Sequence, residues 1–202
     1  MHLTQPPGYR LQRGITLIES LVAILVMAIG ILGILGLQIR TLTDTQAGVR
    51  RAQAIRLIED LGERLQNNPD ALGNLSAYTA TPTASDDCAS SACAPDKLAT
   101  YDIKQWRTSV TNALPGSQAI VFIPQGGPRQ LGVLIGWNEN RYDKNNSQDY
   151  SALTTPLKVS GTDSAGAAVN CPADLICHLQ YIQPTQRCTP WALGSGALYC
   201  PN

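Results

Sequence analysis

The sequence predicts an α+β protein in which a long N-terminal spine helix packs on a small antiparallel β-sheet head containing disulfides. An uncharged apolar run at residues 20–39 continues into an amphipathic helical pattern that ends near residue 66. Strand-like segments follow only after residue 118, and all six cysteines lie beyond residue 87. Helices followed by strands are typical of α+β folds with a segregated antiparallel sheet.

The apolar run at residues 20–39 is long enough to cross a membrane. At a rise of ~1.5 Å per residue it extends about 30 Å, the thickness of a hydrocarbon core. Arg10 and Arg13 precede the run and favour a cytoplasmic N-terminus, although basic residues also follow it. An ordinary secretory signal has a shorter apolar region and a small-residue cleavage site after it, unlike this run. We therefore expect the first half of the helix to be transmembrane.

Glu19 is the acidic residue at the head of this run. A carboxylate inside an apolar membrane helix costs roughly a few kcal/mol unless it is paired, so such residues are functional candidates. A plain single-span anchor explains the run but does not explain Glu19. The alternative is that Glu19 lies at the level of the lipid headgroups, because it is close to the expected helix start.

The residues around Glu19 resemble a known processing signal. The sequence GITLIE at residues 14–19, with a short basic leader before it and the apolar run after it, resembles the class III signal of type IV pilins and type II secretion pseudopilins. The resemblance implies that a prepilin peptidase removes residues 1–14 by cutting between Gly14 and Ile15. Ile15, which stands where the family more often has phenylalanine, would then be N-methylated.

The resemblance also gives Glu19 a role in assembly. It implies that Glu19, the fifth residue of the mature chain, pairs with the N-terminal amine of a neighbouring subunit. Breaking such a pair in a low dielectric leaves an uncompensated charge, so the pair would set the register of one helix against the next. The resemblance extends over residues 10–66.

One spine helix is expected to run from residue 15 to residue 66, before a globular head at residues 67–202. Apolar residues in its second half recur at three- and four-residue spacings: Ala54, Ile55, Ile58, Leu61 and Leu65. Asn67-Asn68-Pro69 then ends the helix. Three glycines in the membrane part, Gly30, Gly33 and Gly36, favour either close helix packing or local unwinding outside the bilayer.

The start of the head combines a loop with a second helix. Residues 67–95 are rich in small and polar residues and indicate a loop, within which Cys88 and Cys93 are expected to form a disulfide. A helix capped by Asp96 should follow and end at Pro115-Gly116. Its apolar positions are Leu98, Ile103, Trp106, Val110 and Leu114. We expect Trp106 to lie in the core.

The strands are expected in the last part of the chain. Residues 119–123 and 131–137 flank a glycine-rich turn and indicate an antiparallel hairpin whose bulky face could cover the spine helix. A weaker strand is expected at residues 157–160 and a clearer one at 175–182, where His178 lies on the polar face. The tail, residues 186–202, is expected to be held against the sheet by disulfides.

The cysteine pattern favours disulfides in an oxidising compartment. Beyond the expected Cys88–Cys93 bond, three pairings remain open for the four late cysteines: Cys171, Cys177, Cys188 and Cys200. The alternative is a zinc site formed by Cys171, Cys177, His178 and Cys188. None of the gaps between these cysteines is a CxxC spacing, which makes zinc the poorer interpretation.

The sequence gives little support for a nucleic-acid, catalytic or metal-binding site. The net charge is zero and aromatic residues are sparse, which argues against a nucleic-acid partner. His178 is the one histidine after the leader, and no catalytic motif occurs, so we expect neither an enzyme nor a cofactor. Residues 143–149 place oxygen-bearing side chains at alternating positions. They lack the glycine and the bidentate acid of an EF-hand, so we expect no metal there.

The head adds a narrower resemblance. CASSAC at residues 88–93, followed by DKLATYDIKQW at residues 96–106, is similar to minor pilins of the PilV type. This implies a structural subunit that primes or caps the type IV pilus, with roles in twitching motility and cell adhesion. The implied partners are other minor pilins, the major pilin, a tip adhesin, the prepilin peptidase and the inner-membrane assembly platform. The protein would cross the inner membrane once, with a periplasmic head, before joining the pilus at the cell surface.

Two alternatives remain. A type II secretion pseudopilin would share every N-terminal residue named above. A membrane-anchored module whose cystine-rich head binds a surface would act without any other pilin.

Overall fold

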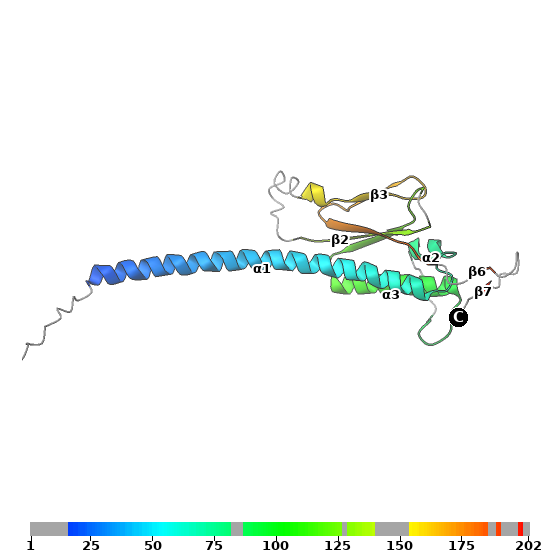
Figure 1. Cartoon of the computed structure of the whole chain (residues 1–202), viewed down its shortest axis with the longest axis horizontal. Helices are drawn as coiled ribbons and strands as arrows, with labels where there is room; N and C mark the ends of the chain where they lie inside the picture. Colours follow the sequence, from blue (N-terminus) through cyan, green and yellow to red (C-terminus); the bar gives the residue numbers. More distant parts are fainter. Residues whose placement is uncertain are drawn as a thin grey trace, which may run out of the picture. The chain divides into compact units, whose positions relative to one another are not determined.

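A computed structural model describes residues 16–81, 87–126, 129–139, 154–185, 189–190 and 198–199 (Figure 1). The backbone contacts divide the chain into an N-terminal unit, Met1–Asp44, and a C-terminal unit, Thr45–Asn202. The long helix α1, Leu17–Asn67, contributes its first part to the N-terminal unit and its last part to the C-terminal unit.

Helix α1 contains 51 residues and confirms the expected spine helix to within two residues at each end. Among the described residues it is the one helix that is long and apolar enough, by length and composition, to cross a membrane. The backbone N–H of Asn68 still donates to the carbonyl of Arg64, and the helix then gives way to turns around Pro69. Proline cannot donate the hydrogen bond that would extend a helix, which explains the predicted stop.

The last part of α1 contributes one face to the main core of the C-terminal unit. Ala54, Ile58, Leu61 and Leu65 are fully buried on that face. They pack with helix α3, Pro95–Ala113, and with the sheet. Figure 1 shows α3 running alongside this part of α1.

Trp106 of α3 is fully buried in this core, as predicted. Its indole Nε1 donates a hydrogen bond of 2.6 Å to the backbone carbonyl of Leu57 on α1. The side chain therefore joins the two helices both by apolar burial and by a directed polar contact.

A three-stranded antiparallel sheet covers the helices and confirms the predicted hairpin. The strands are β1, Gln118–Phe122; β2, Leu131–Trp137; and β5, Ile176–Ile182; their order in the sheet is β1-β2-β5. Every residue of the central strand β2 is buried. Its bulky face joins the main core through Leu131, Val133, Ile135 and Trp137.

The other face of the sheet carries a second, smaller core. Leu134, Leu175 and Cys177 form this core, and Val159 and Val169 pack against it. A small hairpin consists of β3, Ser160–Thr162, and β4, Ala168–Asn170; Val159 directly precedes β3, and Val169 lies in β4. Figure 1 shows β3 on the side of β2 away from the helices.

Phe122, the chain's single phenylalanine, lies between the sheet and this hairpin. Its ring occupies the space that a Cβ would need at Gly132 on β2 and at Gly161 on β3. A Cβ at Gly161 would lie 2.7 Å from the Cζ atom of Phe122. Tyr181 of β5 meets the same ring edge-on, with the ring centroids 6.2 Å apart.

Two expectations about short elements were wrong. The segment expected to be a loop contains helix α2, Leu75–Thr79, in which Leu75 and Tyr78 are buried. The strand expected at residues 157–160 begins only at Ser160, because Leu157 ends the 3₁₀ turn η1, Thr155–Leu157. Both elements are too short for hydrophobic periodicity to reveal them.

The cap of α3 also differs from the prediction. Ala94 is the N-cap residue and Pro95 occupies the first turn, so Asp96 lies inside the helix. Proline suits this position because the first N–H groups of a helix lack intrahelical partners. Asp96 still acts favourably, since a carboxylate in the first turn complements the helix dipole.

The described parts of the tail form a separate ladder. Strands β6, Thr189–Pro190, and β7, Leu198–Tyr199, pair antiparallel with each other. The other residues of the predicted tail segment, 186–202, lie outside the described residues.

Candidate functional site

The expected processing residues, Gly14 and Ile15, lie outside the described residues. The description begins at Thr16, whose carbonyl accepts hydrogen bonds from the N–H groups of Glu19 and Ser20, at 3.0 and 3.2 Å. Glu19 therefore lies in the first turn of α1, and its side chain is exposed. The positive end of the helix dipole favours a carboxylate at this position.

The surface of α1 behind Glu19, from residue 21 to residue 37, is apolar on all sides. Large side chains from Leu17, 79% exposed, to Leu42, 59% exposed, project from the helix. Such a continuous apolar surface is not stable in water, and it marks a membrane-spanning or protein-binding segment. Gly30, Gly33 and Gly36 lie in this segment with no atom near the position of a Cβ, which leaves room for a close neighbour.

Within the described residues, the carboxylate of Glu19 has no ion pair or hydrogen bond. An acid at the edge of an apolar helix is stable in lipid when a cation meets it. The arrangement therefore suits a subunit contact in which an external positive charge binds Glu19 while the apolar side chains pack on lipid or on other helices.

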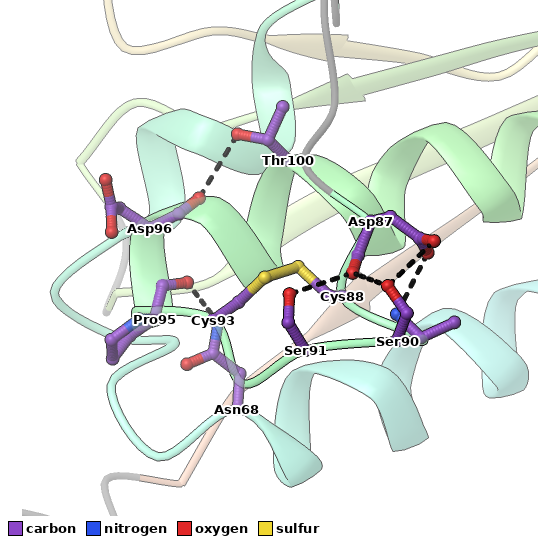
Figure 2. The surroundings of a disulfide bond; sticks show 10 residues. Asn68, Asp87, Cys88, Ser90, Ser91, Cys93, Pro95, Asp96 and Thr100 are labelled. Carbon is purple, nitrogen blue, oxygen red and sulfur yellow. Dashed lines mark hydrogen bonds between the residues drawn. A yellow bond between two sulfur atoms is a disulfide. The ribbon is translucent and has the colours of Figure 1, made fainter.

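The predicted disulfide between Cys88 and Cys93 is present, with the two Cα atoms 5.5 Å apart (Figure 2). It precedes the start of α3. Beside it, the amide of Asn68 donates to the carbonyl of Pro95 at 2.8 Å and to the hydroxyl of Tyr78 at 3.0 Å. Asn68, which is buried, therefore connects the end of α1 to α2 and α3.

A second disulfide joins Cys171 to Cys177 on β5, with the two Cα atoms 5.8 Å apart. This bond decides between the three pairings of the four late cysteines that the sequence left open. It also removes two thiolates from the alternative zinc site, since neither sulfur is free to bind a metal. Cys188 and Cys200 lie outside the described residues, as do residues 143–149, where the sequence predicted no metal site.

His178 occupies a different position from the one expected. It is half-buried, opposite Ile135, on the sheet face that meets α1. Burial and the nearby charge of Arg51 lower the pKa of His178 below its ordinary value, which favours the neutral imidazole. The polar-face prediction failed because the alternation on β5 puts His178 on the same face as Ile176 and Ile182.

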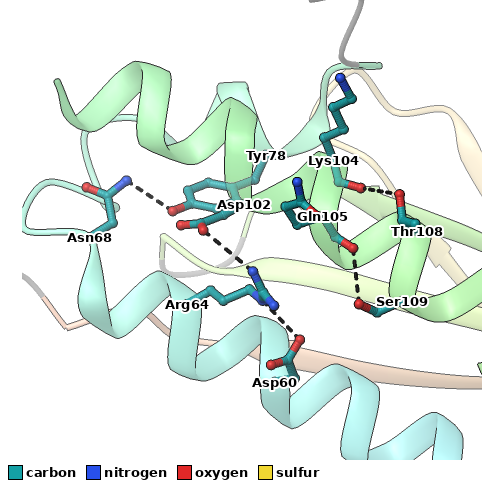
Figure 3. A network of polar contacts seen from close by, with 9 residues as sticks. All are labelled: Asp60, Arg64, Asn68, Tyr78, Asp102, Lys104, Gln105, Thr108 and Ser109. Atoms are coloured by element: carbon teal, nitrogen blue, oxygen red, sulfur yellow. Dashed lines mark hydrogen bonds and ion pairs between the residues drawn. The ribbon is translucent and has the colours of Figure 1, made fainter. Parts of the chain in front are cut away.

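A polar network that sequence analysis missed lies between α1 and α3 (Figure 3). The guanidinium of Arg64 lies 3.0 Å from a carboxylate oxygen of Asp60 and 3.7 Å from one of Asp102. The Asp102 side chain is only 12% exposed. Burial raises the pKa of Asp102 to about 6; Arg64 opposes this shift and Asp60 adds to it. Helical spacing could have revealed that Asp102 is buried, because it falls among the buried positions Ala99, Ile103 and Trp106.

Tyr78 lies next to this network and receives the hydrogen bond from Asn68. Burial raises the pKa of Tyr78 to about 12, so its hydroxyl stays neutral. These contacts connect α1, α2 and α3.

The Asp102→Asn variant is expected to stabilise the C-terminal unit at neutral pH. Folding raises the pKa of Asp102 from 3.8 to about 6. The protonated carboxyl therefore contributes fully to the free energy of unfolding below the unfolded pKa, and this contribution is lost as pH rises through 6. Asparagine resembles the neutral form. We expect a gain of about 1–3 kcal/mol in the free energy of unfolding near pH 8, and little change near pH 4.

Urea unfolding of the full-length protein in detergent micelles at both pH values measures this difference. Asp96→Asn is the matched control, because its carboxylate is exposed at the start of the same helix. A gain for Asp102→Asn that is equal at both pH values would contradict the explanation.

Comparisons with known proteins agree with this arrangement. Residues 9–35 match the family model of the prokaryotic N-terminal methylation motif. Residues 36–104 match the family model described as type IV pilin Tt1218. No curated protein and no solved structure matches the chain.

Proposed function

Because the chain belongs to a type IV pilin-like family, we propose that it is a minor pilin, a structural subunit of the type IV pilus. It would prime assembly or form part of the tip complex, and so support twitching motility and adhesion. One observation carries the proposal: α1 has an exposed apolar first part that begins at Glu19. The last part of the same helix contributes buried residues to a disulfide-containing α+β unit.

The proposed maturation follows from the N-terminal motif. The prepilin peptidase cuts between Gly14 and Ile15, removes residues 1–14, and leaves Ile15 as the methylated N-terminus. Glu19 then lies about one helical turn from this end. The amine of one subunit and the carboxylate of the next are the complementary charges that align adjacent helices during assembly.

The proposed location places the apolar part of α1 in the inner membrane and the C-terminal unit in the periplasm. The disulfides Cys88–Cys93 and Cys171–Cys177 support this side of the membrane, because disulfides persist in oxidising compartments. The partners in this scheme are the assembly platform, the major pilin, other minor pilins and a tip adhesin. After extraction from the membrane the subunit would lie in the pilus at the cell surface.

Mass spectrometry of the mature protein tests the maturation step. We expect a chain that begins at N-methylated Ile15, purified from cells that contain the peptidase. The control is a strain without the peptidase, in which the leader should remain. An unmethylated chain, or one that begins elsewhere, would refute the proposed processing.

Deletion of the gene tests the choice of machine. A minor pilin is expected to be needed for surface pili and twitching. Retention of secreted proteins in the periplasm, with normal piliation, would instead identify a type II secretion pseudopilin. Ligand binding by the protein in the absence of other pilins would favour the surface-binding module.

A further inference from the structure

Among the described residues, the three-stranded sheet ends at the edge strand β5. This strand pairs with β2 on one side, and no described strand pairs with its other side. Its residues, ICHLQYI, include no proline, lysine, arginine, aspartate or glutamate. Exposed edges in natural proteins are usually protected by charge, proline, a bulge or a covering element, because the unpaired backbone groups otherwise bind another strand. The other edge strand, β1, lies beside α2, and among the described elements the short turn η1 lies beside β5.

A groove of about 390 Å³ runs between α1 and the C-terminal end of β5. Gly62 faces Ile182 across the groove, where a Cβ at position 62 would make an ordinary van der Waals contact at 3.7 Å. Tyr181 is 44% exposed beside the groove. The residues that line it are Ile58, Glu59, Gly62, Glu63, Gln66, Gln180, Tyr181, Ile182 and Gln183.

The helix side of the groove is acidic. Glu59 and Glu63 are four residues apart, and both are exposed. Like charges at this spacing destabilise a helix by about 0.2–0.5 kcal/mol. The ion pairs in the described part of the chain do not include either glutamate, and Arg64 is engaged by Asp60 and Asp102. A basic side chain in the groove would relieve this repulsion.

We propose that an extended segment of a different pilin subunit, carrying a lysine or arginine, adds to the outer edge of β5 at its C-terminal end, beside the groove. Its backbone pairs with β5 and its basic side chain lies beside Glu59 and Glu63. The inference rests on the proposed function, because it takes the partner to be a subunit of the same assembly.

Charge complementarity is the ground for assigning the occupant to a different chain. None of the described strands contains lysine or arginine, so none of them, contributed by a second copy, would complement the acidic side. The described strands of the tail, β6 and β7, pair with each other and not with β5.

Site-specific photo-cross-linking tests this contact in the full-length protein in assembling cells. The photoreactive residue p-benzoylphenylalanine replaces Tyr181 at the edge or, as a control, Thr111, which is exposed on α3. We expect a cross-link from position 181 to another pilin subunit, at about tenfold higher yield than from position 111. Peptide mapping should place the cross-link in a segment with a lysine or arginine.

Charge reversal supplies the second arm of the test. Glu59→Lys combined with Glu63→Lys is expected to lower the cross-link from position 181 about tenfold, because like charges then meet across the contact. Asp96→Lys, which changes an exposed acid away from the groove, should leave the yield unchanged.

Several outcomes overturn the inference: equal yields at the two positions, a cross-link within the chain or to a second copy, or a target segment without a basic residue. Incorporation into pili is measured in the same cells. Normal incorporation without the cross-link contradicts this contact alone. Absence of the wild-type protein from pili contradicts the proposed function as well.

Discussion

Glu19→Ala is expected to reduce incorporation of the protein into pili by about 100-fold, while membrane insertion and leader cleavage continue. In the proposed assembly the carboxylate meets the N-terminal amine of a neighbouring subunit in a low-dielectric environment. Removing one partner of a buried ion pair costs about 3–5 kcal/mol, and each 1.4 kcal/mol corresponds to about tenfold in an equilibrium. The apolar surface that inserts into the membrane is unchanged by the substitution.

Immunoblotting of sheared pili against the membrane fraction measures this ratio. Ser20→Ala is the matched control, because it alters the next residue of the same helical turn without removing a charge. Cleavage is followed in the membrane fraction by the mass of the chain. Incorporation of Glu19→Ala at the wild-type level would show that the carboxylate does not hold the subunit in register.

Trp106→Ala is expected to lower the free energy of unfolding of the C-terminal unit by about 3–5 kcal/mol. The side chain is fully buried between α1, α3 and the sheet, so its removal leaves a large cavity in the main core. The variant also loses the hydrogen bond to the carbonyl of Leu57. Trp106→Phe keeps much of the apolar volume and should cost less, about 1–2 kcal/mol.

Protease susceptibility of the full-length protein in micelles, measured across a urea series, reports this loss. Thr108→Ala is the control, since Thr108 is exposed on the same helix and should change stability by less than about 0.5 kcal/mol. Equal urea midpoints for Trp106→Ala and Thr108→Ala would show that the core does not depend on the indole.

The sequence was most informative where one pattern extended over many residues. The spine helix could be predicted because its apolar run and its amphipathic continuation together cover about fifty residues. The recurrence of bulky residues at every second position of Leu131–Trp137 likewise predicted a strand with one face on the helices, and that face joins the main core. Both signals are periodic, so single exceptions did not obscure them.

The missed features depend on contacts between distant segments. Helix α2 has only five residues, and its burial comes from packing that no local pattern encodes. The Cys171–Cys177 bond could not be chosen by counting, since pairing depends on the bend that brings Cys171 back to β5. Asp102 was overlooked because a polar residue on an otherwise apolar helix face lowers the amphipathic signal, and its partner Arg64 lies on another helix.

The ring of Phe122 makes three positions of the chain depend on one another. The ring fills the space that a side chain would need at Gly132 and at Gly161. It is therefore the ring, and not the local backbone conformation, that requires glycine at these two positions. Neither glycine has the positive φ angle that would require glycine for conformational reasons. Substitutions at these positions are therefore coupled: a larger residue at 132 or 161 becomes acceptable only together with a smaller one at 122.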